Sequence, residues 1–442
     1  MITKLLHQIW NERKQNAWLF FELFIVSIFM WLAIDPLFNL VIRDNIAKGY
    51  NSDNIYSIYF SHHNKRSPKY KAEFDNATTI SENYMQILNF VENMPEIENY
   101  GISKGNFPGS DFSGKWDFTV SGEMRADGKE IKKEICYYIN VQTTKSNYYK
   151  TFEIKDAATG EIYKETKDNN GGCYVSKSLA KKLFDTESAI GKRINMDKMQ
   201  RSFTVSGVFE DVQSVIYSEP GELMIINQEF TTPNNNYTAT DYVIHIKLKK
   251  GVDTHLFKKK IENEIMPQLS IGNIYCKNFI SHEEMKHLYE DVYGIKNKYR
   301  QNFIISSFAI LCTILGIIGT FWIRAVARRQ EIGIMQSVGA TRGTIVGQFV
   351  IEAVILATFA FALTMPLILH KIHTMGFAEP LTTFIEYKPI GETALWCNKP
   401  VPHFIIVSAI SYVLITITCI IGAAIPVAVT IKREPVEALR EE

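Results

Sequence analysis

The stretch RAVARRQEIGIMQSVGATRGTIVGQFVIE, from Arg324 to Glu352, decides how this chain is organised. It joins two long apolar segments, 303–323 and 345–369. Within it lie four arginines and a single acidic residue before the next hydrophobic run; the arginines are Arg324, Arg328, Arg329 and Arg342. Because Lys and Arg gather on the cytoplasmic side of membrane proteins, this linker is expected inside the cell.

The middle of the linker, 326–338, has the spacing of a short helix with one apolar face, carried by Ile332, Met335 and Val338. Gly339 predicts the end of that helix, and Thr341 predicts the cap of the next one. Taken by itself, the pattern fits either a solvated loop or a helix that docks on a partner.

Composition divides the chain into apolar and polar regions. The 442 residues exceed one ordinary domain, and the 48 Lys and Arg nearly balance the 47 Asp and Glu. This balance argues against a nucleic-acid partner, which requires a large basic excess. Apolar residues concentrate toward the two ends of the chain, whereas 45–300 is polar. We therefore expect a membrane protein with one large water-exposed insert.

Four segments are long and apolar enough to cross a hydrocarbon core of about 30 Å, which takes about 20 helical residues. They are residues 17–42, 302–326, 345–370 and 402–430. Lys and Arg precede the first span, fill the linker between the second and third, and follow the fourth. Both termini are therefore expected in the cytoplasm, with 43–300 outside.

The first span is interpreted as an uncleaved signal anchor, because it is too long for a signal-peptide core and no small-residue cleavage pattern ends it. Asp35 and Pro36 are expected to mark the outer end of this span, where the helix bends.

The insert carries the alternating patterns of a mixed α/β domain. Strand, helix and strand are predicted in turn over 54–60, 81–94 and 97–104, and again over 241–248, 254–266 and 273–279. Two such units predict a ferredoxin-like layer built from separate parts of the chain. A helix over 283–300 is expected to run straight into the second span.

The predicted fold is an α-helical membrane protein of four transmembrane helices, with a large α+β extracytoplasmic domain of two subdomains inserted between helices 1 and 2. The expected regions are 1–43, with the cytoplasmic lead and first span, the insert 44–300, and 301–442 with the other three spans. Within the insert, subdomain one is expected to be 50–138 plus 236–282, and subdomain two 139–235.

The insert shows no evident catalytic set. GSDFSGKW, from Gly109 to Trp116, nearly spells a phosphate-binding loop, but Trp116 stands where a magnesium-binding hydroxyl is required. His282 and His287 resemble a zinc-binding pair, yet at i and i+5 their imidazoles point to different faces of a helix. We therefore predict no catalytic residue and no metal site.

Four cysteines fall in the regions predicted to lie outside the cell: Cys136, Cys173, Cys276 and Cys397. They form no C-x-x-C pair, so neither a zinc site nor a thioredoxin-like site is indicated. A disulfide among them and unpaired buried thiols are both compatible with this spacing.

Ionisable and small residues within the spans indicate helix contacts. Gln348 and Glu352 lie one turn apart on one face of the third span. A carboxylate there is expected in an interhelical or dimer contact, unless it reaches to the membrane surface. Glu22, near the edge of the first span, is expected to reach the surface in that way. Four small residues, Gly316 and Gly319 in the second span and Gly422 with Ala423 in the fourth, are expected to allow close helix approach.

Three stretches carry a family resemblance. The first is RRQEIGIMQSVGATRGTIVGQFVIEAVIL at 328–356, with arginines, Glu-Ile-Gly, a Gly-Ala-Thr turn, and then Gln and Glu on the next helix. The others are CYVSKSLAKKLFDTESAIGKRINMDKMQRSFTVSGVFEDV at 173–212 and REPVEALR at 433–440. With one span, a large insert and three spans, the chain resembles the FtsX/MacB-type permeases of ABC transporters along its whole length.

The resemblance implies a partner for the linker helix. In this family it docks in a groove of a separate cytoplasmic ABC ATPase, and here the apolar contacts would be Ile332, Met335 and Val338, with Arg328, Arg329 and Glu331 as polar ones. No Walker A motif is seen, so no cofactor is expected in this chain, and ATP and Mg would be bound by the ATPase.

The resemblance also implies a place and further partners. The place is the bacterial inner membrane, spanned several times, with the large domain in the periplasm. A second permease subunit, identical or related, is expected to pair with this chain in contact with membrane lipid. A periplasmic adaptor or an outer-membrane factor is a further candidate partner.

The implied function is a permease subunit that couples ATP hydrolysis by the separate ATPase to movement of its periplasmic domain. Its task would be efflux or periplasmic export of drugs, peptides or lipoproteins, which the large insert favours. The alternatives are signalling to a periplasmic cell-wall hydrolase and a membrane-anchored sensor.

Overall fold

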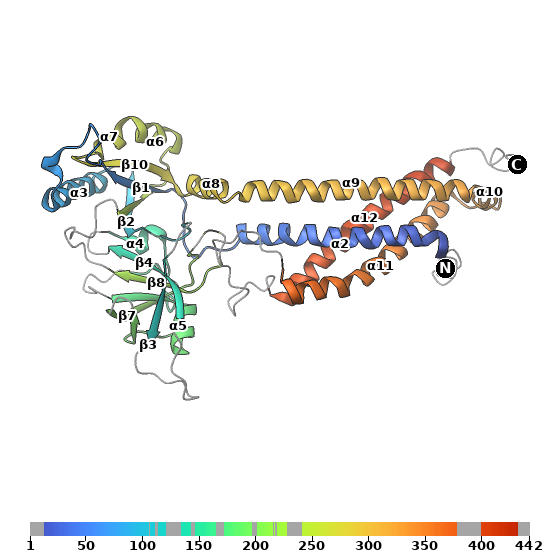
Figure 1. Cartoon of the computed structure of the whole chain (residues 1–442), viewed down its shortest axis with the longest axis horizontal. Helices are drawn as coiled ribbons and strands as arrows, with labels where there is room; N and C mark the ends of the chain where they lie inside the picture. Colours follow the sequence, from blue (N-terminus) through green and yellow to red (C-terminus); the bar gives the residue numbers. More distant parts are fainter. Residues whose placement is uncertain are drawn as a thin grey trace. The chain divides into compact units, whose positions relative to one another are not determined.

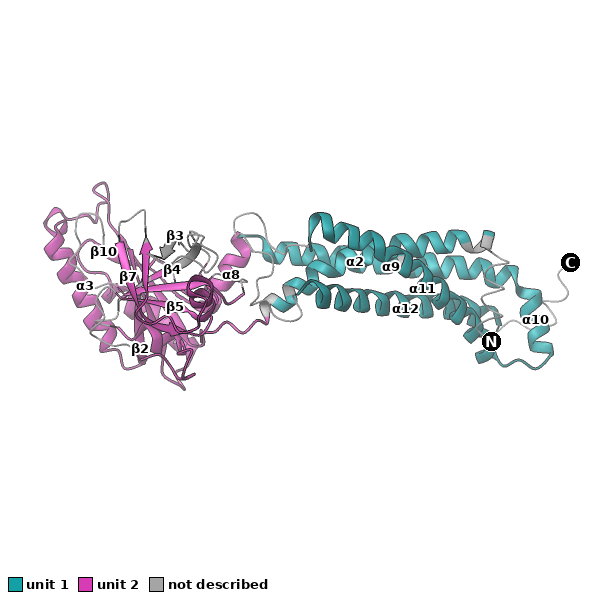
Figure 2. Cartoon of the chain, turned by 90° about the horizontal axis from the view of Figure 1, so that it is seen from below, with its two compact units in different colours: residues 1–44, 293–442 teal, residues 45–292 magenta. Residues whose placement is uncertain are grey.

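A computed structural model describes most of the chain, namely residues 13–105, 107–110, 114–120, 134–142, 146–164, 172–196, 201–214, 216, 219–227, 241–377 and 399–431. The chain forms two compact units, the membrane unit, Met1–Asp44 with Tyr293–Glu442, and the insert unit, Asn45–Val292 (Figure 2). The loop that holds Cys397 and most of the basic residues expected at the two termini lie outside the described residues, which do include Arg13 and Lys14.

Four described helices of the membrane unit are long and apolar enough to cross a membrane (Figure 1). They are α2 (Arg13–Asp44), α9 (Ile295–Ala327), α11 (Arg342–Met375) and α12 (Pro400–Ile431). A short helix, α10 (Arg329–Ser337), connects α9 to α11. The α/β insert between the first and second of these spans confirms the predicted fold class.

Small residues let the spanning helices approach one another. α9 and α11 each pack against both α2 and α12. A Cβ atom added to Gly422 of α12 would lie 2.4 Å from Cγ2 of Ile317 on α9, and one added to Gly316 of α9 would lie 1.9 Å from Oε1 of Glu22 on α2. The expected close approach is confirmed at Gly316 and Gly422, but it is wrong at Gly319, where nothing lies within 4 Å of an added Cβ. Glu22, which we expected to extend to the membrane surface, instead turns toward α9.

The end of α2 differs from the sequence expectation. Pro36 lies inside the helix, which continues to Asp44. Asp35 is fully buried, and its Oδ1 lies 2.7 Å from Nε2 of His403 on α12. Its other oxygen lies 3.9 Å from Nζ of Lys371 on α11. A buried carboxylate is tolerated where it is paired, so Asp35 joins three spans rather than marking a helix end.

The insert unit is built on a sheet of ten described strands, in the order β10-β1-β9-β2-β4-β3-β6-β7-β5-β8. Their bounds are β1 Ile55–His62, β2 Ile97–Lys104, β3 Gly114–Val120, β4 Glu134–Gln142, β5 Gly172–Ser176, β6 Arg193–Met196, β7 Arg201–Phe209, β8 Leu223–Asn227, β9 Tyr242–Leu248 and β10 Ile274–Ser281. A further parallel pairing between β4 and β8 closes the last six strands into a ring.

The first four strands of this order confirm the predicted ferredoxin-like layer. All their pairings are antiparallel, and helices connect β1 to β2 and β9 to β10. These helices are α3 (Ala77–Glu92) and α6 (Thr254–Lys260), the latter extended by a π-helical turn, Ile261–Ile265, and by α7 (Met266–Gln268). Asn76 caps α3 by accepting from the Thr79 amide, and Asp253 caps α6 by accepting from the amides of His255 and Leu256.

The ring half of the sheet begins earlier in the chain than the expected subdomain boundary. The boundary between residues 138 and 139 falls inside β4, which pairs with β3 and β8 along its length and with β2 at its end. The pairing therefore places β3 with the ring. Two short helices, α4 (Tyr148–Phe152) and α5 (Lys177–Phe184), accompany these strands.

The helix expected over 283–300 is divided in two. α8 (His282–Val292) ends the insert unit, and α9 begins at Ile295. Gly294, between them, has a φ of 65°, a left-handed conformation that favours glycine and interrupts a helix. The predicted single helix is therefore interrupted at this point.

One polar cluster is buried inside the insert unit. His245, on the central strand β9, lies 2.9 Å from the hydroxyls of both Ser57 and Ser103, one on each ring nitrogen. Burial lowers its pKa well below the usual value, aided by nearby His282. The pKa of His282 is lowered to about 3, first by burial and then by the charge of Lys48. Both imidazoles are therefore neutral at pH 7.

Candidate functional site

The connection between α9 and α11 is a compact double turn. α10 ends in a Schellman motif, in which the amide of Gly339 donates to Gln336 and that of Ala340 donates to Met335. Gly339 has a φ of 92°, as this motif requires. Thr341 then caps α11 by accepting from the Thr344 amide. The predicted stop and cap are therefore confirmed, and α10 is a folded helix.

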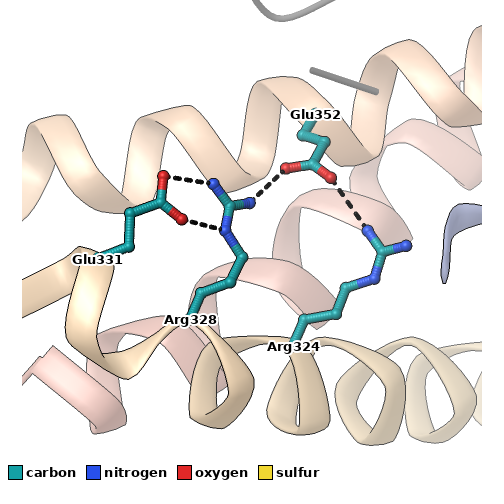
Figure 3. A network of polar contacts seen from close by, with 4 residues as sticks. All are labelled: Arg324, Arg328, Glu331 and Glu352. Carbon is teal, nitrogen blue, oxygen red and sulfur yellow. Dashed lines mark hydrogen bonds and ion pairs between the residues drawn. The ribbon is translucent and has the colours of Figure 1, made fainter. Parts of the chain in front are cut away.

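Four charged side chains meet at this connection and form what we call the clamp, Arg324, Arg328, Glu331 and Glu352 (Figure 3). Nη1 of Arg324 lies 3.1 Å from one oxygen of Glu352, and Nη1 of Arg328 lies 3.2 Å from the other. The Arg328 guanidinium also donates to Glu331 through Nε at 2.6 Å and Nη2 at 2.9 Å. Arg328 therefore links Glu331 of α10 to Glu352 of α11.

Three members of the clamp are shielded from solvent, whereas the Glu331 side chain is 43% exposed. The Glu352 side chain is 3% exposed, and those of Arg324 and Arg328 are 12% and 13% exposed. The two guanidinium carbons lie 5.6 Å and 4.9 Å from the ring centres of Phe321 and Phe349, within cation–π range. Removing one partner of such a buried pair costs about 3–5 kcal/mol, because the other charge stays behind.

Arg328 also occupies the backbone joint. It is at once the last cap of α9 and the first cap of α10, with φ −101° and ψ 23°. Arg328 is therefore the residue at which the chain turns from α9 into α10, and its own side chain binds the helices on either side of that turn.

The structure separates the apolar residues predicted for the docking face. Ile332 is 3% exposed and packs into the core of the membrane unit, and Met335 is partly buried against the same core. Val338, by contrast, is 83% exposed, and it is joined by Ile334, which is 56% exposed. The free apolar surface of α10 is therefore formed by Ile334 and Val338.

The polar residues predicted for this face are also separated. Arg328 and Glu331 belong to the clamp, in which they bind each other and Arg328 also binds Glu352. Arg329, by contrast, starts α10 and is partly buried. Gln348 lies one turn before Glu352 and is partly buried on α11. Arg324 was not predicted as a site residue, although its i, i+4 spacing from Arg328 places both on one helix face.

No group of His, Cys, Asp and Glu suited to a metal ion occurs among the described residues. His287 Nδ1 lies 3.0 Å from Glu290, while His282 packs against Phe107. Cys173 and Cys276 have free thiols, and burial raises the pKa of each to about 12.

The fold and the clamp define a class, a multi-pass membrane protein with an α/β domain between its first and second spans. Residues 41–264 match the family model of the MacB-like periplasmic core domain, and residues 303–435 match that of the FtsX-like permease C-terminal domain. The chain belongs to the FtsX/MacB-type family of ABC transporter permeases.

Individual relatives are distant. The macrolide export ATP-binding/permease protein MacB of Neisseria meningitidis is 25% identical over 205 residues, which cover 45% of this chain and 30% of that protein. The ABC transporter permease YknZ of Bacillus subtilis, itself uncharacterized, is 26% identical over 224 residues, which cover 50% of this chain and 51% of YknZ. The match to this chain thus spans at most about half the length of these two relatives.

Two solved domains are similar to parts of this chain. The periplasmic region of MacB from Actinobacillus actinomycetemcomitans has a TM-score of 0.34 and 14% identity, covering 55% of this chain and 94% of that one. The extracellular domain of YknZ has a TM-score of 0.30 and 11% identity, covering 50% of this chain and 100% of that one.

Proposed function

We propose that this chain is the permease subunit of an ABC transporter whose ATP-hydrolysing subunit is a separate cytoplasmic polypeptide, and that α10 docks on that subunit. Family membership supports a transporter permease, and the surface of α10 supports the docking. ATP and Mg would then be bound by the partner ATPase.

The observation that carries the proposal is the division of α10 into two faces. Ile332 anchors the helix to the membrane unit, while Ile334 and Val338 stay exposed. Exposed apolar side chains on a short helix, spaced i and i+4, are the anchors by which a helix enters a groove. Their exposed neighbours Gln330 and Ser337 form a polar rim, as at protein interfaces.

The same proposal gives the protein its orientation. The arginines of the α9–α11 connection support a cytoplasmic position for α10, because Lys and Arg gather on that side. With four spans, both termini then lie in the cytoplasm and the insert unit lies in the periplasm of a bacterial inner membrane. A second permease subunit, identical or related, would pair with this one, because the ATPase subunits of such transporters act as a pair.

We place the task of the transporter in efflux or periplasmic export of drugs, peptides or lipoproteins. The name of the Neisseria relative, which refers to macrolide export, supports this direction. Movement of the insert unit, driven by ATP hydrolysis, would act on a substrate on the periplasmic side, with an adaptor or outer-membrane factor as the next carrier.

The test uses the full chain, affinity-tagged and purified in detergent from its native membrane. The wild-type chain should carry with it a polypeptide with a Walker A motif and measurable ATP hydrolysis. In the double variant I334E/V338E, the amount of co-purified ATPase polypeptide and the rate of ATP hydrolysis should each fall at least tenfold, because two charges would enter the apolar contact. The matched control is L288E, which places the same charge at an exposed leucine of the insert unit.

Two results would overturn the proposal. One is a wild-type chain that carries no ATPase under conditions where its fold is intact. The other is an I334E/V338E variant that keeps wild-type ATPase association.

A further inference from the structure

α9 has one covered side along its whole length. Ile295, Ser306 and Ile317 are buried, and Ile310 packs against the core of the membrane unit. These positions are separated by nearly whole turns of an α-helix, so they share one side.

The opposite side of α9 is apolar and exposed. Its residues, each more than half exposed, are Ile304, Ile305, Phe308, Leu311, Leu315 and Ile323. Because α9 is long and apolar enough to cross a membrane, this exposed side is the one that meets hydrocarbon.

The apolar run of α9 has the thickness of a bilayer core. From Phe303 to Ile323 the helix rises about 30 Å, at about 1.5 Å for each residue, and a hydrocarbon core is about 30 Å thick. Arg324 follows immediately and binds Glu352. With one edge of the core at Ile323, the other edge falls at Phe303.

Two basic residues lie just beyond Phe303. Arg300 and Lys298 precede it by about 4.5 Å and 7.5 Å along the helix axis. The headgroup layer extends about 5–7.5 Å beyond each side of the core, since a whole bilayer is about 40–45 Å thick. Tyr299, between the two, is 41% exposed, and tyrosine is enriched at membrane interfaces. Both cations therefore belong to the headgroup layer.

The two basic residues continue the exposed side of α9. Arg300 lies one turn before Ile304 and Lys298 two turns before Ile305, so each is in line with an exposed apolar side chain. Arg300 is exposed and Lys298 is partly exposed. In the part of the chain that the structure describes, neither has an ion-pair partner. Both charges are thus available to groups outside the chain.

Their position departs from the usual distribution of charge. Lys and Arg gather on the cytoplasmic side of membrane proteins, whereas the proposed orientation puts this end of α9 on the periplasmic side. An anionic headgroup at the same depth supplies the opposite charge, and the guanidinium of an arginine binds phosphate through two parallel hydrogen bonds. A zwitterionic headgroup carries its own cation, which opposes this attraction.

We propose that Lys298 and Arg300 bind the headgroups of anionic phospholipids in the periplasmic leaflet, at the end of α9 away from α10. The choice of leaflet rests on the orientation given with the proposed function. The contact itself needs no ATPase. Each basic residue near an anionic surface strengthens binding by a factor of about 5.

The test reads the lipid next to α9 in the full chain, reconstituted in phosphatidylcholine vesicles. A bimane fluorophore is attached to I304C, one turn from Arg300, in a background without the native cysteines. Quenching by nitroxide-labelled phosphatidylglycerol and by nitroxide-labelled phosphatidylcholine gives their relative association at this point. We expect phosphatidylglycerol to be preferred by about fivefold or more. The preference should weaken in about 0.5 M salt, because salt screens exposed charges.

The double variant K298Q/R300Q removes both charges and should bring the two lipids to nearly equal association at I304C. The matched control K250Q/K259Q removes two exposed charges from the insert unit, and it should keep the preference. A second label, at I323C near the opposite end of α9, reads the other leaflet. Its quenching should not respond to K298Q/R300Q.

Three results would overturn this inference. One is equal quenching of I304C by the two lipids without further substitutions, and another is a preference that K298Q/R300Q leaves intact. The third is the absence of quenching by either lipid, which would show that another helix covers this side of α9. A chain that carries no ATPase counts against the proposed function alone, because the lipid preference is measured without the ATPase.

Discussion

The crossing of α9 and α12 at Gly422 yields a sharp prediction for G422A. The added Cβ would lie 2.4 Å from Cγ2 of Ile317 and 2.9 Å from its Cβ. Carbon atoms prefer about 3.5–4.0 Å, so the closer contact is short by about 1.1 Å (3.5 minus 2.4). A β-branched side chain on a helix has one strongly preferred rotamer, so Ile317 cannot easily turn aside.

The expected cost follows from two opposed effects. Overpacking of this kind destabilises by about 1–3 kcal/mol, whereas replacing Gly by Ala inside a helix gains at most about 1 kcal/mol. We therefore expect G422A to lose up to about 2 kcal/mol of unfolding free energy. Gly319 is the matched control, because nothing lies within 4 Å of a Cβ added there, and G319A should be neutral or stabilising.

The assay is reversible unfolding of the full chain in mixed detergent micelles. The double variant G422A/I317A supplies the decisive comparison, since Ile317→Ala removes the nearest obstructing atom, Cγ2, and leaves only the Cβ at 2.9 Å. On that background G422A should cost less than in the wild-type chain, which gives a coupling energy of about 0.5–2 kcal/mol in the double-mutant cycle. If G422A and G319A have equal stability, or if the cycle shows no coupling, the close approach of α9 and α12 is incorrectly described.

Two further predictions concern the insert unit and the α10–α11 turn. The folded-state pKa values of His245 and His282 are lowered, so the unfolded chain binds more protons than the folded chain in acid. The free energy of unfolding should therefore keep its full value above pH about 6.5 and fall toward pH 3. The fall should be up to about 1.4 kcal/mol per pH unit for each histidine. Urea midpoints of the insert unit, followed by pulse proteolysis of the full chain between pH 7.5 and 5, measure this loss, and H282L should reduce the slope; an unchanged slope contradicts the assignment. At the turn, G339A places a side chain at φ 92° and should cost about 1–2 kcal/mol, raising the rate of proteolytic cleavage there by about 5–30-fold. G343A, in regular helix without nearby atoms, should not raise it.

Much of the architecture could be read from sequence periodicity. Apolar runs of sufficient length predicted all four spans, because a lipid-facing helix must be apolar along most of its surface. Strand and helix alternation predicted the ferredoxin-like layer, since half-buried strands and helices have different periods. Gly339 and Thr341 predicted the ends of α10 and α11, because those positions need particular local chemistry.

Sequence periodicity could not predict which side of α10 faces the membrane unit. Ile332, Met335 and Val338 share an apolar spacing with Ile334 close by, and the sequence does not state whether the membrane unit or a partner covers each one. The structure buries Ile332 and exposes Ile334 and Val338. The difference arises because a nine-residue helix between two spans packs first on its own bundle, and only the remainder is available to a partner.

The stretch from Arg324 to Glu352 shows both sides of this division. By itself the sequence determined that a short basic helix connects two spans, because charge, glycine and capping residues act within a few residues of one another. Only the tertiary structure decided that Glu352 binds Arg324 and Arg328, at sequence separations of 28 and 24 residues. Ion pairs at such distances depend on how α9 and α11 are brought together by α2 and α12, and that is set by packing across the whole membrane unit rather than by any local pattern.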